Sequence, residues 1–114
     1  MQYGFNSDFS KATLPNVYGG NATVNVTAGQ STEIEVDLRA IMGANVVYPW
    51  ALIATPIFGT ILDLPAYNSG ISVETYVDIT NGDTTMEVTG HIIVHNTSAS
   101  NISGLLIMYT AIGP

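Results

Sequence analysis

Hydrophobic and polar side chains alternate with a period of two between residues 23 and 38. This period is typical of strands with one buried and one exposed face. The exposed positions of the second run are acidic: Glu33, Glu35 and Asp37. The pattern predicts two strands connected by residues 28–30. The connection is either a three-residue hairpin loop, which pairs Val24 with Ile34, or an arch that crosses between two sheets.

A longer alternating pattern surrounds the dipeptide Asn81-Gly82. This dipeptide is favoured in two-residue type I′ turns, because both turn positions need a positive φ angle. We therefore predict a hairpin in which Val77 lies opposite Met86 and Tyr76 lies opposite Glu87. In this register one face of the hairpin is mostly apolar and the other is mostly polar.

Residues 40–62 contain no charged side chain. The length suits a membrane helix, which needs about 20 apolar residues. However, Pro49 and Pro56 interrupt the segment, and its many β-branched residues prefer strands. We predict two strands instead, over residues 46–54 and 57–62, and no membrane span.

Two further segments complete the expected set of elements. Residues 105–112 are apolar except for Thr110, which predicts a strand that is buried on both faces or covered by a partner. Residues 37–45 fit one short turn of helix. The sequence thus predicts an all-β fold, a single antiparallel β-sandwich of jelly-roll or immunoglobulin-like type. We expect the sandwich to cover residues 21–114, after an aromatic N-terminal arm over residues 1–20.

Composition limits the function. The chain has 114 residues, of which 10% are charged, against roughly 25% in ordinary soluble domains. Nine carboxylates against two bases give a net charge of −7. Nucleic-acid binding requires clustered basic residues, so we exclude it, and an anionic membrane surface would repel the chain. Cysteine is absent, which removes disulfides and thiolate metal sites.

We find no residue pattern typical of an enzyme or of a metal site. His91 and His95 are four residues apart, which on a strand is about 13 Å, so they cannot share one metal ion without a third element or a symmetry mate. We interpret them as exposed structural histidines. The segment 78–83 resembles a calcium loop only faintly, because its glycine is displaced by one position and the hairpin turn already explains it. The acidic row in residues 33–37 is interpreted as a solvated strand face. We expect no catalytic residue, cofactor or metal ion.

The apolar side chains exceed what one small core can enclose. Outward-facing apolar patches mark protein–protein contacts, and aromatic residues often anchor them. We therefore predict association with copies of the same chain and with a larger protein shell or filament. The expected interface residues are Tyr3, Phe5, Phe9, Tyr48, Trp50, Phe58, Leu105, Ile107 and Tyr109.

The build of the chain resembles the decoration, or cement, proteins of tailed-phage capsids. The likeness is carried by residues 23–38 (TVNVTAGQSTEIEVDL), the long hairpin with its Asn-Gly turn, and the closing segment GLLIMYTAIGP. It implies a sandwich that trimerises on a capsid in the virion and stabilises it mechanically, without enzymatic activity. The alternation around residues 27–32 is equally similar to immunoglobulin-like modules of cell-surface proteins.

Two alternatives therefore stay open. The chain could be an extracellular filament or adhesin module assembled by strand donation, or a small carbohydrate-binding sandwich. The first residues lack the basic and apolar regions of a signal peptide, although export stays open. For an exported chain, the sequons that begin at Asn21, Asn25, Asn96 and Asn101 could carry glycans.

Overall fold

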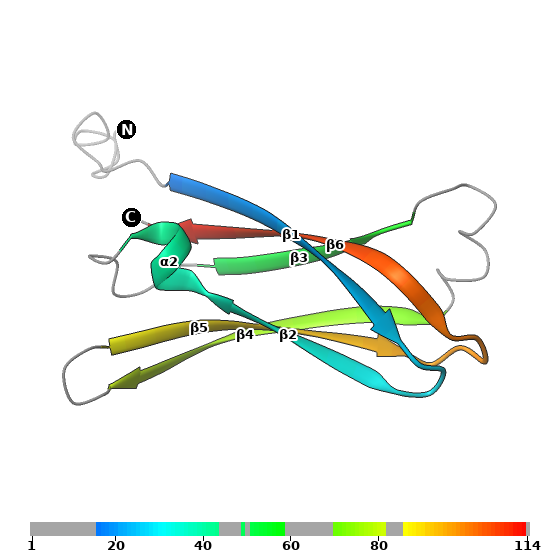
Figure 1. Ribbon diagram of the computed structural model, residues 1–114. Coiled ribbons are helices and arrows are strands. Elements are labelled where there is room, and N and C mark those ends of the chain that lie inside the picture. Colours follow the sequence, from blue (N-terminus) through cyan, green and yellow to red (C-terminus); the bar gives the residue numbers. More distant parts are fainter. Residues whose placement is uncertain (1–15, 44–48, 50, 59–69, 82–85, 114) are drawn as a thin grey trace, which may run out of the picture.

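The computed structural model describes residues 16–43, 49, 51–58, 70–81 and 86–113. These residues form two antiparallel three-stranded sheets and one short helix (Figure 1). Sheet A has the strand order β1-β6-β3, and sheet B has the order β2-β5-β4. The elements are β1 (Asn16–Val26), β2 (Ser31–Asp37), α2 (Leu38–Met42), β3 (Ala51–Ile57), β4 (Ile71–Asn81), β5 (Met86–Asn96) and β6 (Ile102–Gly113). The prediction of an all-β, antiparallel fold is confirmed.

The connection between β1 and β2 is an arch and not a hairpin. Val24 lies opposite Leu105 in sheet A, and Ile34 lies opposite Ile92 in sheet B, so the two strands belong to different sheets. Gly29 adopts a φ of 73° in the arch, a conformation that favours glycine. Alternation alone allows both connections, because in either one the apolar residues face the interior.

The β4–β5 hairpin is confirmed, but its register differs from the prediction. Val77 lies opposite Gly90, Tyr76 lies opposite His91, and the ladder ends at the pair Asn81–Met86. The connection therefore spans four residues, 82–85, and not the two of a type I′ turn. The shift displaces each partner by four positions, an even number, so the apolar face stays apolar. Hydrophobic sorting cannot distinguish these two registers.

One strand, β3, covers most of the described part of the two strands that we predicted around Pro56. β3 runs through Pro56, which lies opposite Ile107 at the edge of sheet A. An edge strand tolerates proline, because the missing N–H can face away from the neighbouring strand. The remaining residues of the two predicted strands, 46–48, 50 and 59–62, lie outside the described residues. Among the described residues, no helix is long and apolar enough to cross a membrane.

The short helix is confirmed, and its start is determined by Asp37. The Asp37 carboxylate accepts hydrogen bonds from the backbone N–H groups of Arg39 (3.1 Å) and Ala40 (3.3 Å). This side chain therefore acts as the N-cap of α2. Leu38 and Met42 are the buried residues of the helix, which closes one end of the core.

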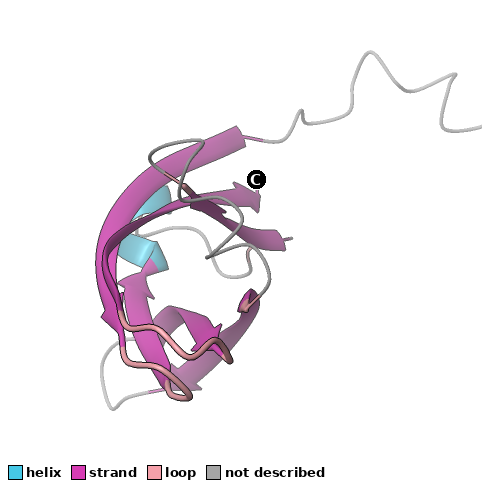
Figure 2. Ribbon diagram, turned by 90° about the vertical axis from the view of Figure 1, so that its right-hand side faces the viewer, coloured by secondary structure: helices cyan, strands magenta, loops and turns pink. Residues whose placement is uncertain are grey.

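The core lies between the inner faces of the two sheets, and the strands curve around it (Figure 2). Its buried side chains are Val24, Val26, Val36, Leu38, Met42, Leu52, Val88, Ile92, Val94, Ile102, Leu105, Ile107 and Ala111. A hydrogen bond from the Thr75 hydroxyl to the Leu52 carbonyl (2.9 Å) joins β4 to β3 across the two sheets.

The terminal strand β6 is buried on one face and not on both. Leu105, Ile107 and Ala111 are buried, whereas Met108 between them is 43% exposed. At the other terminus β1 begins at Asn16, so residues 16–20, which we assigned to the arm, pair with β6. Residues 1–15 lie outside the described residues.

Candidate functional site

Charge is distributed unequally between the two sheets. Within the bounds of β1, β3 and β6, sheet A carries no charged residue. The charged residues that the structure describes lie on sheet B and α2: Glu33, Glu35, Asp37, Arg39, Glu74, Asp78 and Glu87. The molecule therefore presents one neutral sheet and one acidic sheet.

The outer face of sheet A is largely apolar. Its side chains alternate with those of the core and belong to all three strands. Among the large ones, Val17, Ile53, Met108 and Ile57 are 68%, 52%, 43% and 41% exposed. Met108 on the central strand lies opposite Asn21 on β1 and Thr55 on β3. We call Val17, Ile53, Ile57 and Met108 the sheet A patch.

None of the expected interface residues that the structure describes belongs to the sheet A patch. Leu105 and Ile107 are 4% and 0% exposed, so they belong to the core, and this corrects our expectation for both. The reason is parity, since over residues 105–113 of β6 the odd-numbered positions face inward and Met108 faces outward. Phe58 and Tyr109 are partly buried against the core. Outside the described residues lie Tyr3, Phe5, Phe9, Tyr48 and Trp50.

On the outer face of sheet B, His91 is surrounded by carboxylates. The His91 Nδ1 atom lies 2.5 Å from Oε2 of Glu33 and 3.7 Å from Oε2 of Glu35, both on β2. On the other side of the ring, Nε2 lies 3.9 Å from Oδ2 of Asp78 on β4. We call Glu33, Glu35, Asp78 and His91 the His91 cluster. The strand order places β5 between β2 and β4, which brings these four residues together.

His91 is buried, although it lies on the outer face of its sheet. It is 8% exposed, which corrects our interpretation of an exposed histidine. The cause is Tyr76, whose ring stacks on the imidazole with a centroid distance of 4.3 Å and an interplanar angle of 7°. Beneath this ring Nε2 has no hydrogen-bond partner. The sequence did not reveal this arrangement, because the two-residue turn would place Tyr76 opposite Glu87.

His95 forms a separate and more exposed group of contacts. Its Nε2 lies 2.7 Å from Oε1 of Glu74, and its Nδ1 lies 2.6 Å from the hydroxyl of Ser31. Both ring nitrogens therefore have partners. The two histidines occupy the same face, as expected, but each is held by its own neighbours.

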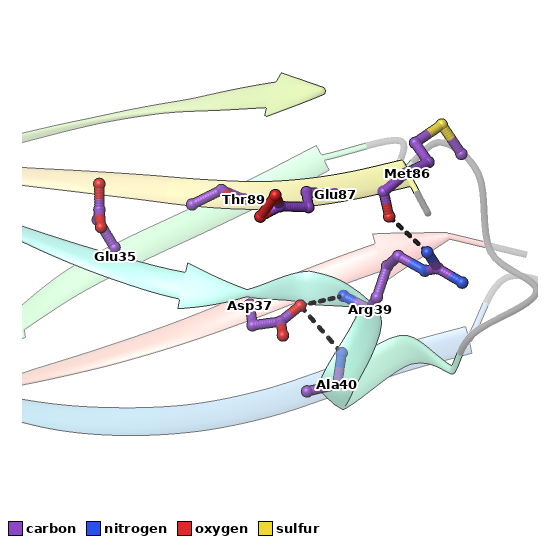
Figure 3. A pocket seen from close by; sticks show the side chains of 7 residues that line it. All are labelled: Glu35, Asp37, Arg39, Ala40, Met86, Glu87 and Thr89. Carbon is purple, nitrogen blue, oxygen red and sulfur yellow. Dashed lines mark hydrogen bonds between the residues drawn. The ribbon is translucent and has the colours of Figure 1, made fainter. Parts of the chain in front are cut away.

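A shallow pocket of about 620 Å³ lies where β2, α2 and β5 meet (Figure 3). It is lined by Glu35, Asp37, Arg39, Ala40, Met86, Glu87 and Thr89. The Arg39 guanidinium donates a hydrogen bond to the Met86 carbonyl and so connects α2 to β5. Asp37 caps the helix at the same place, so the acidic row is not simply a solvated face. Asp37 has a structural function, whereas Glu33 and Glu35 approach His91.

The four sequons differ in accessibility. Asn96 is 1% exposed, and its amide nitrogen donates to the carbonyls of Val26 (3.1 Å) and Ser100 (2.8 Å). Its amide oxygen accepts from the N–H (3.0 Å) and the hydroxyl (2.6 Å) of Ser98. This side chain is unavailable for glycosylation in the folded chain. Asn21, Asn25 and Asn101 are exposed.

Comparison with known proteins finds no family model, no curated protein and no solved structure that matches the chain.

Proposed function

We propose that the chain is a non-enzymatic structural protein that assembles with copies of itself through the outer face of sheet A. The observation that carries this proposal is the segregation of charge. The sheet A patch lies on a sheet without charged residues, while every described charge lies on sheet B or α2. An outward apolar sheet face that no charge interrupts is typical of a protein–protein contact.

A second copy is the occupant that fits this face best. A neutral apolar face excludes partners that bind through charge, and the chain itself supplies a neutral apolar face. Two sheets can pack face to face at about 10 Å, and each apolar Å² buried contributes roughly 25 cal/mol. In such a pair the two acidic sheets lie on opposite sides. Each chain has a net charge of −7, so the two chains repel each other less in this arrangement than in one that brings the acidic sheets together.

For the subunit itself we propose a single β-sandwich of jelly-roll or immunoglobulin-like type. One core contacts both sheets, and the chain crosses between the sheets at residues 27–30, between α2 and β3, between β3 and β4, and between β5 and β6. These crossings support a single folding unit, which should unfold in one cooperative transition.

For the biological setting we propose a virion, where the chain would act as a decoration protein on a shell. The support is the resemblance to phage cement proteins, together with a neutral face suited to permanent contacts. An extracellular filament or adhesin module is the second candidate. One observation favours it, because β1 is an edge strand of sheet A without charge or proline, and such an edge can accept an added strand.

The proposal is tested by introducing charge on one sheet at a time. Ile53→Asp adds a carboxylate to the sheet A patch, and Ser72→Asp adds the same charge to the outer face of sheet B, where Ser72 is exposed. Sedimentation velocity over a range of concentrations measures association. We expect Ile53→Asp to weaken association at least tenfold, because it buries an unpaired charge, and Ser72→Asp to leave association unchanged.

Thermal unfolding of both variants shows whether a change in association comes from a loss of fold stability. Both positions are exposed, so each variant should fold. A wild-type chain that stays monomeric at all concentrations contradicts the proposal. Equal association of wild type and Ile53→Asp contradicts it as well, and loss of association in Ser72→Asp alone would assign the contact to sheet B.

A further inference from the structure

We propose that Glu33, Glu35 and the Nδ1 atom of His91 form a binding site for a divalent metal ion on the outer face of sheet B. One ligand atom from each of these residues lies within 4.8 Å of the others. The proposal is independent of the assembly through sheet A, which lies on the opposite side of the core.

The distances around Nδ1 suit a metal ion. Nitrogen and oxygen ligands of zinc lie about 2.0–2.2 Å from the metal, so two ligands at the tetrahedral angle are about 3.4 Å apart. The two carboxylate oxygens lie 2.5 Å and 3.7 Å from Nδ1, on either side of this value. The Glu35 side chain is 66% exposed and the Glu33 side chain is 39% exposed. Small rotations of these side chains therefore bring both carboxylate oxygens to the same distance from Nδ1.

A buried nitrogen without a partner provides a second and independent argument. In a neutral imidazole one nitrogen carries the proton and the other carries a lone pair. If the proton stays on Nδ1 and points to Glu33, the lone pair of Nε2 is buried without a donor and faces the Asp78 carboxylate at 3.9 Å. A buried polar atom without a partner is unfavourable.

A metal ion on Nδ1 removes this conflict. The proton must then occupy Nε2, from which the N–H points toward Asp78. A histidine that binds metal through one nitrogen and faces a carboxylate with the other is the usual arrangement in metalloproteins. The stacked Tyr76 ring covers the imidazole and holds its plane in place. Asp78 and Tyr76 are therefore positioning residues in this site.

The ligand set selects the kind of metal. One imidazole and two carboxylates suit Zn²⁺ or Mn²⁺, whereas Ca²⁺ prefers oxygen ligands alone. Three protein ligands leave at least one coordination position, which faces solvent because Glu35 is exposed. The site is thus able to hold a metal with a water molecule or with a ligand from another chain.

Isothermal titration calorimetry with ZnCl₂, MnCl₂ and CaCl₂ on the full chain tests the proposal. We expect saturable binding of Zn²⁺ or Mn²⁺ at one site per chain, and weaker binding of Ca²⁺. Glu35→Gln removes one ligand at an exposed position and should weaken binding at least about tenfold, and Asp78→Asn should weaken it by roughly the same factor. His91→Gln should abolish binding, but it alters a buried position, so Glu35→Gln is the decisive variant.

Glu87→Gln and His95→Gln serve as matched controls on the same face. Each lies on β5 four residues from His91, about 13 Å away, and should bind metal as the wild type does. In NMR spectra, Zn²⁺ should shift the Nδ1 resonance of His91 and not those of His95. The proposal is overturned by the absence of saturable binding below about 1 mM. It is also overturned if Glu35→Gln binds with wild-type affinity, if His95→Gln loses binding, or if Ca²⁺ binds more tightly than Zn²⁺ and Mn²⁺.

Discussion

At the scale of single residues, most of the specific chemistry is concentrated around Tyr76 and His91. The tyrosine ring buries the imidazole on an otherwise exposed face, and four carboxylates lie around the pair. Partial desolvation of the phenol raises the pKa of Tyr76 above its ordinary value, and the charges of Glu33, Asp78, Glu35 and Glu74 raise it further. A phenolate at this place would be surrounded by like charges.

This environment predicts a late ionisation of Tyr76. In the unfolded chain the phenol loses its proton near pH 10.0, whereas in the folded chain it keeps the proton to a higher pH. The free energy of unfolding should therefore fall as the pH rises above 10.0, because the unfolded state releases the proton first. Ultraviolet titration of the tyrosines should show a late step that Tyr76→Phe removes. Glu33→Gln should move this step to lower pH, and an unchanged titration in both variants would contradict the assignment.

Asn96 is the residue on which the connection between β5 and β6 depends. Its buried amide satisfies two carbonyls and accepts two hydrogen bonds from Ser98. Asn96→Ala should lower the free energy of unfolding by about 2–4 kcal/mol, because it removes four side-chain hydrogen bonds, among them the one to the carbonyl of the buried Val26. Urea denaturation measures the change. Asn21→Ala, at an exposed position of β1, should change stability by less than about 0.5 kcal/mol, and equal effects of the two substitutions would refute this explanation.

At the scale of elements, alternation predicts which residues face inward but not which strands are neighbours. Val24 and Ile34 face the interior in a hairpin and in an arch alike, so the sequence left both connections open. A hairpin that pairs residues 71–80 with residues 83–92 was predicted from the Asn81-Gly82 signal, and β4 and β5 form a hairpin. The register was missed, since a shift of four residues preserves the apolar face.

The His91 cluster depends on the register of the β4–β5 hairpin and on the strand order of sheet B. For this reason the cluster was not predicted from the sequence. Glu33 and Glu35 are distant from His91 in the sequence, and only the pairing of β2 with β5 brings them together. Tyr76 reaches His91 only in the observed register. Similarly, the sequence predicted an apolar surplus, but it did not reveal that the even-numbered positions within residues 105–113 of β6 face outward. Leu105 and Ile107 are therefore core residues, and Met108 is exposed.

The register itself is testable, because the chain contains no cysteine. Thr80 lies opposite Glu87 in the observed ladder, so Thr80→Cys combined with Glu87→Cys should form a disulfide on mild oxidation. Tyr76→Cys combined with Glu87→Cys tests the register of a two-residue turn. In the observed register these two positions are about four residues apart along the strands, roughly 13 Å, which a disulfide cannot bridge. Thiol quantification under denaturing conditions shows which of the two double variants has formed a disulfide. A disulfide that forms more readily between the cysteines of Tyr76→Cys and Glu87→Cys would contradict the observed register.

At the scale of the whole molecule, the two sheets differ in chemistry. Sheet A presents exposed Val17, Ile53, Ile57 and Met108 without a charge on its strands, and sheet B presents carboxylates around two histidines. One core holds both sheets together, so the difference concerns only the outer faces. This division supports a chain that assembles through one face and keeps the other in contact with solvent or ions.

The most direct test of self-assembly through sheet A is a concentration series of NMR spectra on the unmodified, isotope-labelled chain. Self-assembly through sheet A should shift or broaden the methyl resonances of Val17, Ile53 and Met108 as the concentration rises. Amide resonances of Ser72 and Glu74 on sheet B should stay unchanged. Spectra that do not depend on concentration up to about 1 mM, or changes confined to sheet B, would contradict self-assembly through sheet A.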